Sequence, residues 1–199
     1  MGNPRRSAVR DVLQRACFCL ILVLVRQPAM AQDGATEGHP DRYSLGLALG
    51  TTYDPGGETG FLLLTAAALY DYDKVWPHKA PEALRFKVEA SVGGSFKPDP
   101  DLMAGASVFA LYFLEPLSGS GFKPYIEGGI GLIYTQHRVD GQGLHINFNP
   151  QIGIGTEFSS GSDGVYFAAV RLHHISNGGL DDDNRGVNSI VFTFGKFIW

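Results

Sequence analysis

Leu84-Arg-Phe-Lys-Val-Glu-Ala-Ser-Val92 has an apolar side chain at every second position, and this pattern determines the architecture. The residues between them are charged or small and polar, namely Arg85, Lys87, Glu89 and Ser91. A period of two is that of a β-strand, in which successive side chains point to opposite faces of a sheet. The stretch therefore predicts a strand with one face suited to hydrocarbon and the other to a polar interior.

The same period continues along most of the chain. In residues 43–53, tyrosine, leucine and threonine alternate with serine, glycine, alanine and threonine, which gives one large apolar face and one face of small residues. Segments rich in Gly, Pro, Asp, Asn and Ser separate the runs. Eight strands are predicted, over residues 43–53, 61–73, 84–94, 103–114, 123–135, 147–159, 166–176 and 188–197.

Eight strands of this pattern predict an all-β fold, an eight-stranded antiparallel barrel. A soluble barrel buries its apolar face inward, whereas an outer-membrane barrel turns that face to lipid and keeps polar residues in the lumen. Strands of about ten residues, aromatic residues near many strand ends and the aromatic end Phe197-Ile198-Trp199 favour the transmembrane barrel.

The N-terminus has the composition of a secretory signal. Four arginines precede the apolar run 16–25, and Ala29-Met-Ala31 follows it. The run is too short to span a bilayer as a helix, so a cleaved signal peptide is predicted. The expected organisation is a signal peptide at 1–31, an N-terminal leader at 32–41 and an outer-membrane barrel at 42–199.

Charge and cysteine content exclude several classes of function. Removing residues 1–31 takes away five arginines and one aspartate, which leaves 11 basic and 19 acidic residues, a net charge of −8 that argues against nucleic acid as a partner. Both cysteines, Cys17 and Cys19, lie in the expected signal, so the mature chain is predicted to have no disulfide and no thiolate nucleophile.

The predicted strand at 166–176 ends in a pair of side chains that can carry chemistry. Period two places His174 and Ser176 on the apolar, lipid-facing side, with Cβ atoms roughly 6.5 to 7 Å apart. A histidine within reach of a serine is the arrangement of general base and nucleophile. The spacing alone favours the simpler interpretation, two rim residues that bind loop backbone or lipid headgroups.

The following residues narrow these alternatives. His174-Ile-Ser-Asn-Gly-Gly-Leu180, with Asn184-Arg-Gly-Val-Asn-Ser189 after it, resembles the signature of the lipid A 3-O-deacylase family. The resemblance implies an eight-stranded outer-membrane barrel that cleaves the ester at position 3 of lipid A with a serine-hydrolase triad on its outer surface. By this match Ser176 is the nucleophile, His174 is the general base, and Asn184 occupies a position tied to activity.

One position departs from the family pattern. The third member of the family's triad is a glutamate twelve residues after the serine, where this chain has Asn188. Asparagine can accept a hydrogen bond from imidazole but brings no charge, and an Asp-to-Asn change in a serine-protease triad costs about four orders of magnitude. The acidic run Asp181-Asp-Asp183 is an alternative source of a carboxylate, although a solvated loop or contact with divalent cations bound to lipopolysaccharide is the simpler interpretation of it.

The alternation of side chains along the last predicted strand raises a second question about Asn188. It lies eleven residues before Trp199, so an unbroken strand places the two on opposite faces. A bulge near Gly195 would place them on the same face.

Donors for an oxyanion are expected in the loop after the predicted strand. Asn177, Asn184 and the backbone amides of Gly178 and Gly179 are the candidates, although ordinary turn chemistry explains the same residues. The remaining histidines (His78, His137, His145 and His173) lack metal-ligand spacing, so lumen or loop roles and no metal or other cofactor are predicted.

Three functions follow, in order of support. The first is a serine-type lipid A 3-O-deacylase in the outer membrane, with its site at the outer leaflet and lipopolysaccharide as substrate. The second is a non-catalytic outer-membrane barrel, a decayed member of the same family, which Asn188 supports. The third is a soluble periplasmic lipid-binding barrel. Oligomeric state is left open, with a homodimer as the expected assembly if the chain is not monomeric.

Overall fold

The chain is described by a computed structural model that covers residues 39–55, 59–76, 78–96, 100–159, 161 and 164–198. The expected signal peptide at 1–31 and most of the expected leader at 32–41 lie outside these residues. In the part of the chain that is described, no helix is long and apolar enough to cross a membrane.

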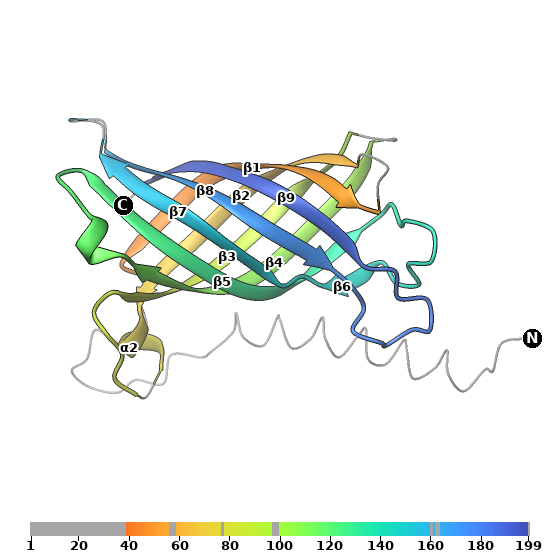
Figure 1. Ribbon diagram of the computed structural model, residues 1–199, viewed down its shortest axis with the longest axis horizontal. Helices are drawn as coiled ribbons and strands as arrows, with labels where there is room; N and C mark the ends of the chain where they lie inside the picture. Colours follow the sequence, from red (N-terminus) through yellow and green to blue (C-terminus); the bar gives the residue numbers. More distant parts are fainter. Residues whose placement is uncertain are drawn as a thin grey trace, which may run out of the picture. The chain divides into compact units, whose positions relative to one another are not determined.

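Antiparallel strands form a closed barrel (Figure 1). Each strand pairs with the next one along the chain, except that β6 and β7 both pair with β5 and not with each other, and the ring closes through pairing of the first strand with the last. The strands are β1 (Arg42–Asp54), β2 (Gly60–Asp71), β3 (Leu84–Ser95), β4 (Asp101–Phe113), β5 (Phe122–Thr135), β6 (Ile146–Phe148), β7 (Gln151–Ser159), β8 (Val165–Ile175) and β9 (Val187–Phe197).

The predicted strand at 147–159 is present as two pieces, β6 and β7, which together occupy one strand position in the barrel. Both pair with β5 in the same register, Leu132 opposite Phe148 and Gly129 opposite Gln151. The interruption falls at Asn149-Pro150, where proline has no N–H to donate to the ladder. The predicted eight-stranded barrel is therefore confirmed.

Two short helices lie at one end of the barrel, away from the connection between β8 and β9 (Figure 1). They are α2 (Tyr72–Val75) and the 3₁₀ helix η1 (Glu115–Leu117). The strand predicted to run to residue 73 ends instead at Asp71, because the chain turns into α2 there.

The apolar faces point outward, as predicted for a membrane barrel. On β1, Leu45, Leu47 and Leu49 are about half exposed, at 47%, 51% and 52%, whereas the small residues between them are buried. The small face gives room to large lumenal side chains: a Cβ on Gly50 would lie 2.0 Å from the ring of Phe61. Alternation on β1 thus supplies both the lipid surface and the space inside.

The lumen contains a buried cluster of ion pairs. Arg171 donates to Glu89 (2.7 and 3.1 Å) and Glu127 (2.7 Å), and Lys87 donates to Glu127 (2.8 Å). Both cations also lie over the ring of Phe109, at 4.4 and 4.6 Å from its centroid. The two negative charges of the carboxylates and the two positive charges of the cations therefore cancel within a site that excludes most solvent.

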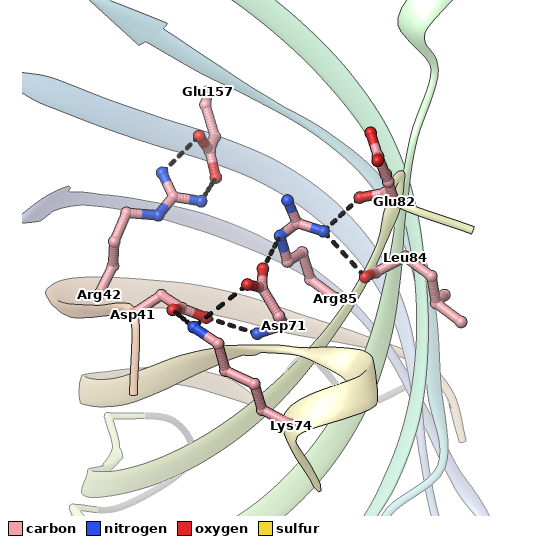
Figure 2. A network of polar contacts seen from close by, with 8 residues as sticks. All are labelled: Asp41, Arg42, Asp71, Lys74, Glu82, Leu84, Arg85 and Glu157. Atoms are coloured by element: carbon pink, nitrogen blue, oxygen red, sulfur yellow. Dashed lines mark hydrogen bonds and ion pairs between the residues drawn. The ribbon is translucent and has the colours of Figure 1, made fainter. Parts of the chain in front are cut away.

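Polar contacts also join the strands at the end that carries α2 (Figure 2). Arg42 of β1 makes two hydrogen bonds of 2.7 Å to Glu157 of β7. Lys74 of α2 contacts Asp41 and Asp71, and Asp71 pairs with Arg85 of β3 at 3.1 Å. Burial alone raises the pKa of Asp41, but the hydrogen bonds from Lys74 and the Asp71 amide outweigh it and lower that pKa. Paired charges thus hold this end together.

Candidate active site

His174 and Ser176 lie at the opposite end of the barrel, where β8 stops. Along β8 the side chains of Val170 and Leu172 point outward and are 46% and 52% exposed, while Arg171 and His173 are buried in the lumen. His174, two residues after Leu172, is on the outward face and half-buried. The alternation predicted for this strand is therefore present.

The backbone around the pair is fixed by the sheet. The His174 amide donates to the carbonyl of Pro150 at 3.0 Å. Ser176 exchanges two backbone hydrogen bonds with Phe148, of 2.8 and 3.1 Å, so the period of two extends one residue past the strand. In the described residues no hydrogen bond joins the Ser176 hydroxyl to the His174 imidazole. Serine–histidine contacts of this kind often tighten only when substrate binds.

Asn188 is the hydrogen-bond partner of His174. The two residues are opposite each other on β8 and β9, and His174 Nδ1 lies 2.7 Å from Asn188 Oδ1. Asn188 faces outward in the same alternation as Ile190 and Phe192. The residue at the position of the family's glutamate therefore reaches the imidazole nitrogen that a triad's third member contacts.

A carboxylate lies on the far side of Asn188, from a strand that sequence reasoning did not connect with the site. Asn188 Nδ2 donates to Asp54 Oδ2 at 3.0 Å, and the other oxygen, Oδ1, accepts from Arg185 at 3.2 Å. His174, Asn188 and Asp54 thus form a chain of hydrogen bonds across β8, β9 and β1.

A β-bulge brings Asp54 to this position. Thr52 pairs with Ser189, but Asp54 pairs with Asn188, so Tyr53 is an extra residue in β1. Without that insertion Asp54 would share the lumenal face of Ser44 and Thr52, because a shift of one residue reverses the direction of every side chain. The bulge expected near Gly195 was wrong: β9 keeps its register past this residue with both neighbours, and the irregularity is on β1.

The loop after β8 is held by the asparagines of the motif. The Asn177 amide donates to Asn184 Oδ1 at 2.8 Å, and Asn177 Nδ2 donates to the carbonyl of Asp183 at 2.9 Å. Asn177 Oδ1 in turn accepts from the amide of Gly179 at 2.8 Å. In the described residues the Gly178 amide and Asn184 Nδ2 have no partner. Both are therefore available as donors next to Ser176.

The acidic run Asp181–Asp183 makes its contacts within itself and with the loop between β5 and β6. Asp181 Oδ1 accepts from the Asp183 amide at 3.1 Å, and the Asp183 carbonyl accepts from Gly143 at 2.7 Å. A Cβ on Gly143 would lie 2.3 Å from Asp181 Oδ1, so this carboxylate packs on the loop between β5 and β6. The carboxylate bound to Asn188 is Asp54.

Gly186 packs against the face of the candidate base. A Cβ added to it would lie 2.7 Å from Cε1 of His174. A pocket of about 250 Å³ also borders the imidazole. Its lining comes from β1, β7, β8, β9 and the turn before β7, and consists of Tyr53, Pro150, Gln151, Ile152, Leu172, His173, His174 and Asn188.

The other histidines are dispersed. His173 is buried in the lumen with its ring 5.8 Å from that of Phe61. His78 hydrogen-bonds with the Tyr72 hydroxyl at 3.1 Å, and His145 Nδ1 lies 2.8 Å from the carbonyl of Thr135. Within the described residues no three His, Cys, Asp or Glu side chains come together as a metal site.

A family model and a curated protein that match this chain are both lipid A deacylases. The family model described as "Lipid A 3-O-deacylase (PagL)" matches residues 63–197. The chain is 34% identical to lipid A deacylase PagL of Pseudomonas aeruginosa over 125 residues, which are 60% of this chain and 69% of that protein.

Solved structures are similar as well. The crystal structure of the outer membrane enzyme PagL matches with a TM-score of 0.56 and 25% identity, over 77% of this chain and 98% of that one. Neisserial surface protein A matches with a TM-score of 0.58 and 16% identity, over 78% of this chain and 94% of that one. The second likeness concerns the fold alone.

Proposed function

The chain belongs to the lipid A 3-O-deacylase (PagL) family, and we propose that it is an outer-membrane hydrolase that removes the 3-hydroxyacyl chain from position 3 of lipid A, with Ser176 as nucleophile. The observation that carries the proposal is the hydrogen bond of 2.7 Å between His174 Nδ1 and Asn188 Oδ1 on the lipid-facing wall. It occupies one ring nitrogen and leaves Nε2 to act as a base.

His174 is needed because a serine hydroxyl is a poor nucleophile at neutral pH. In the proposed first step Nε2 takes the hydroxyl proton while Ser176 Oγ bonds to the ester carbonyl carbon. The tetrahedral intermediate then collapses, the bond to the sugar oxygen at position 3 breaks, and that oxygen takes the proton from His174. The acyl chain is left as an ester on Ser176.

Water completes the cycle. His174 takes a proton from a water molecule whose oxygen bonds to the acyl-enzyme carbonyl carbon. The bond between that carbon and Ser176 Oγ then breaks, and Oγ takes the proton from His174. The products are 3-O-deacylated lipid A and a free 3-hydroxy fatty acid. No cofactor enters this scheme.

The charge on the tetrahedral oxygen needs donors that are not already engaged. The amides of Asn177 and Gly179 are bound to asparagine side chains in the loop. We therefore assign the oxyanion to the Gly178 amide and Asn184 Nδ2. The 2.8 Å contact of Asn184 Oδ1 with the Asn177 amide holds this side chain beside the peptide that follows Ser176.

The side chains around His174 face outward from the barrel, which supports the membrane as the source of substrate. Outward-facing Val170 and Leu172 precede His174 on β8, and Ile152 on β7 is 64% exposed. Together with the pocket beside His174, these side chains offer an apolar surface for an acyl chain, which would approach from within the membrane. We place this end of the barrel at the outer leaflet, where lipopolysaccharide resides.

Mass spectrometry of lipid A tests the proposal. Lipid A from cells that express this chain is expected to lack one 3-hydroxyacyl group, and cells that express Ser176→Ala are expected to retain it. Heat-modified gel mobility checks that the variant barrel is folded. Identical lipid A from both strains would instead support the non-catalytic barrel.

A further inference from the structure

We propose that Asp54 is a positioning residue of the site, which acts through Asn188 to fix the tautomer of His174. The inference rests on the proposed function, because it concerns the base of that reaction. It is independent of the family signature, since Asp54 precedes the segment that the family model matches, residues 63–197.

The direction of each hydrogen bond carries the argument. A carboxylate has no proton to donate, so the Asn188 atom that faces Asp54 at 3.0 Å is the amide nitrogen. The amide oxygen of Asn188 then faces His174, and at 2.7 Å it accepts from Nδ1–H. A neutral imidazole with its proton on Nδ1 has its lone pair on Nε2, which is the form that a general base requires.

Asparagine alone lacks this directional preference. Its oxygen and nitrogen are nearly equal in shape, so an unrestrained amide can present either one to the imidazole. With the nitrogen toward His174, Nδ1 becomes the acceptor, the proton moves to Nε2 and the base is blocked. This wrong tautomer explains the cost of Asp-to-Asn replacement in serine proteases. Asp54 removes this ambiguity without contacting His174 itself, because its carboxylate can accept only from the amide nitrogen of Asn188.

The surroundings of Asp54 are suited to this role. The bulge at Tyr53 turns it to the outer face opposite Asn188, and bulges are over-represented beside active sites because they redirect a side chain. Arg185 contacts Oδ1 at 3.2 Å and leaves Oδ2 to Asn188. The carboxylate is thus held from two sides, by β9 and by the loop before it.

The test is a series of purified, folded variants assayed for 3-hydroxy fatty acid release from lipid A. Asp54→Asn is expected to lower the rate by about tenfold to a hundredfold, the bias that one hydrogen bond to a charged group supplies. The exchanged pair Asp54→Asn with Asn188→Asp is expected to recover most of that loss. In this double variant the carboxylate at position 188 is an acceptor whichever way it turns, and the amide at position 54 donates to it.

Two controls isolate the effect. Asp140→Asn removes one exposed carboxylate from the loop between β5 and β6 and is expected to leave the rate unchanged. Arg185→Gln breaks the other contact of Asp54 and is expected to cost less than about fivefold, since exposed ion pairs contribute about 0 to 1 kcal/mol.

The outcomes separate the two proposals. If Ser176→Ala is inactive but Asp54→Asn is as fast as the unaltered chain, the role of Asp54 is refuted and the hydrolase stands. If Asp54→Asn is slow and the exchanged pair equally slow, Asp54 acts on the structure and not on the tautomer, and the role is again refuted. Activity in Ser176→Ala would refute the proposed function itself.

Discussion

Replacement of Gly186 by alanine is expected to disable the site without unfolding the barrel. The added Cβ would lie 2.7 Å from Cε1 of His174, whereas ordinary contacts begin at 3.4 Å, so the ring must retreat by 3.4 − 2.7 = 0.7 Å. Asn188 holds the ring at Nδ1, so the displacement tilts Nε2, the nitrogen proposed as the base, away from its place in the unaltered chain. A misplacement near 1 Å costs about 100-fold in rate.

The assay is the release of 3-hydroxy fatty acid by purified Gly186→Ala in detergent micelles, with turnover measured at saturating lipid A. Gly128→Ala is the matched control, because a Cβ at that strand position meets nothing within 4 Å. We expect Gly128→Ala to keep full turnover and Gly186→Ala to lose about two orders of magnitude. Equal turnover in the two variants would refute the assignment of His174 as the base.

Two further predictions concern the barrel. Arg171→Ala leaves Glu89 and Glu127 with one cation and is expected to lower the free energy of unfolding by about 3 to 5 kcal/mol, measured by urea titration in lipid vesicles; an unchanged midpoint would contradict the ion cluster. Leu47→Arg places a charge on the lipid face and is expected to cost about 2 to 4 kcal/mol, while Leu47→Met costs little. Equal stability of the two Leu47 variants would mean that this face does not contact lipid.

The sequence predicted the barrel because period two links local structure directly to burial. Once Lys87 and Glu89 alternate with Val88 and Val92, only one side of the strand can face lipid, and the remaining strands follow the same rule. The alternation did not predict where individual strands break or end. The break at Pro150 and the early end of β2 at Asp71 depend on a single missing donor and on a short helix.

The candidate site was predictable in part for the same reason. His174, Ser176 and Asn188 lie on one wall because alternation on two paired strands places them there. Asp54 was missed because alternation counted along β1 sends it into the lumen, and the inserted Tyr53 that reverses its direction has no signature in the residues themselves. The irregularity was expected on β9, near Gly195, and occurs on the strand beside it.

Whether Ser176 is the nucleophile is best decided by covalent labelling of the folded, purified chain with an acyl-chain phosphonate that reacts with activated serines, followed by peptide mass spectrometry. We predict one adduct, on Ser176, which is lost in His174→Ala and suppressed by excess lipid A. A deacylase-active chain with no adduct on Ser176, or with the adduct on another residue, would contradict the proposed mechanism.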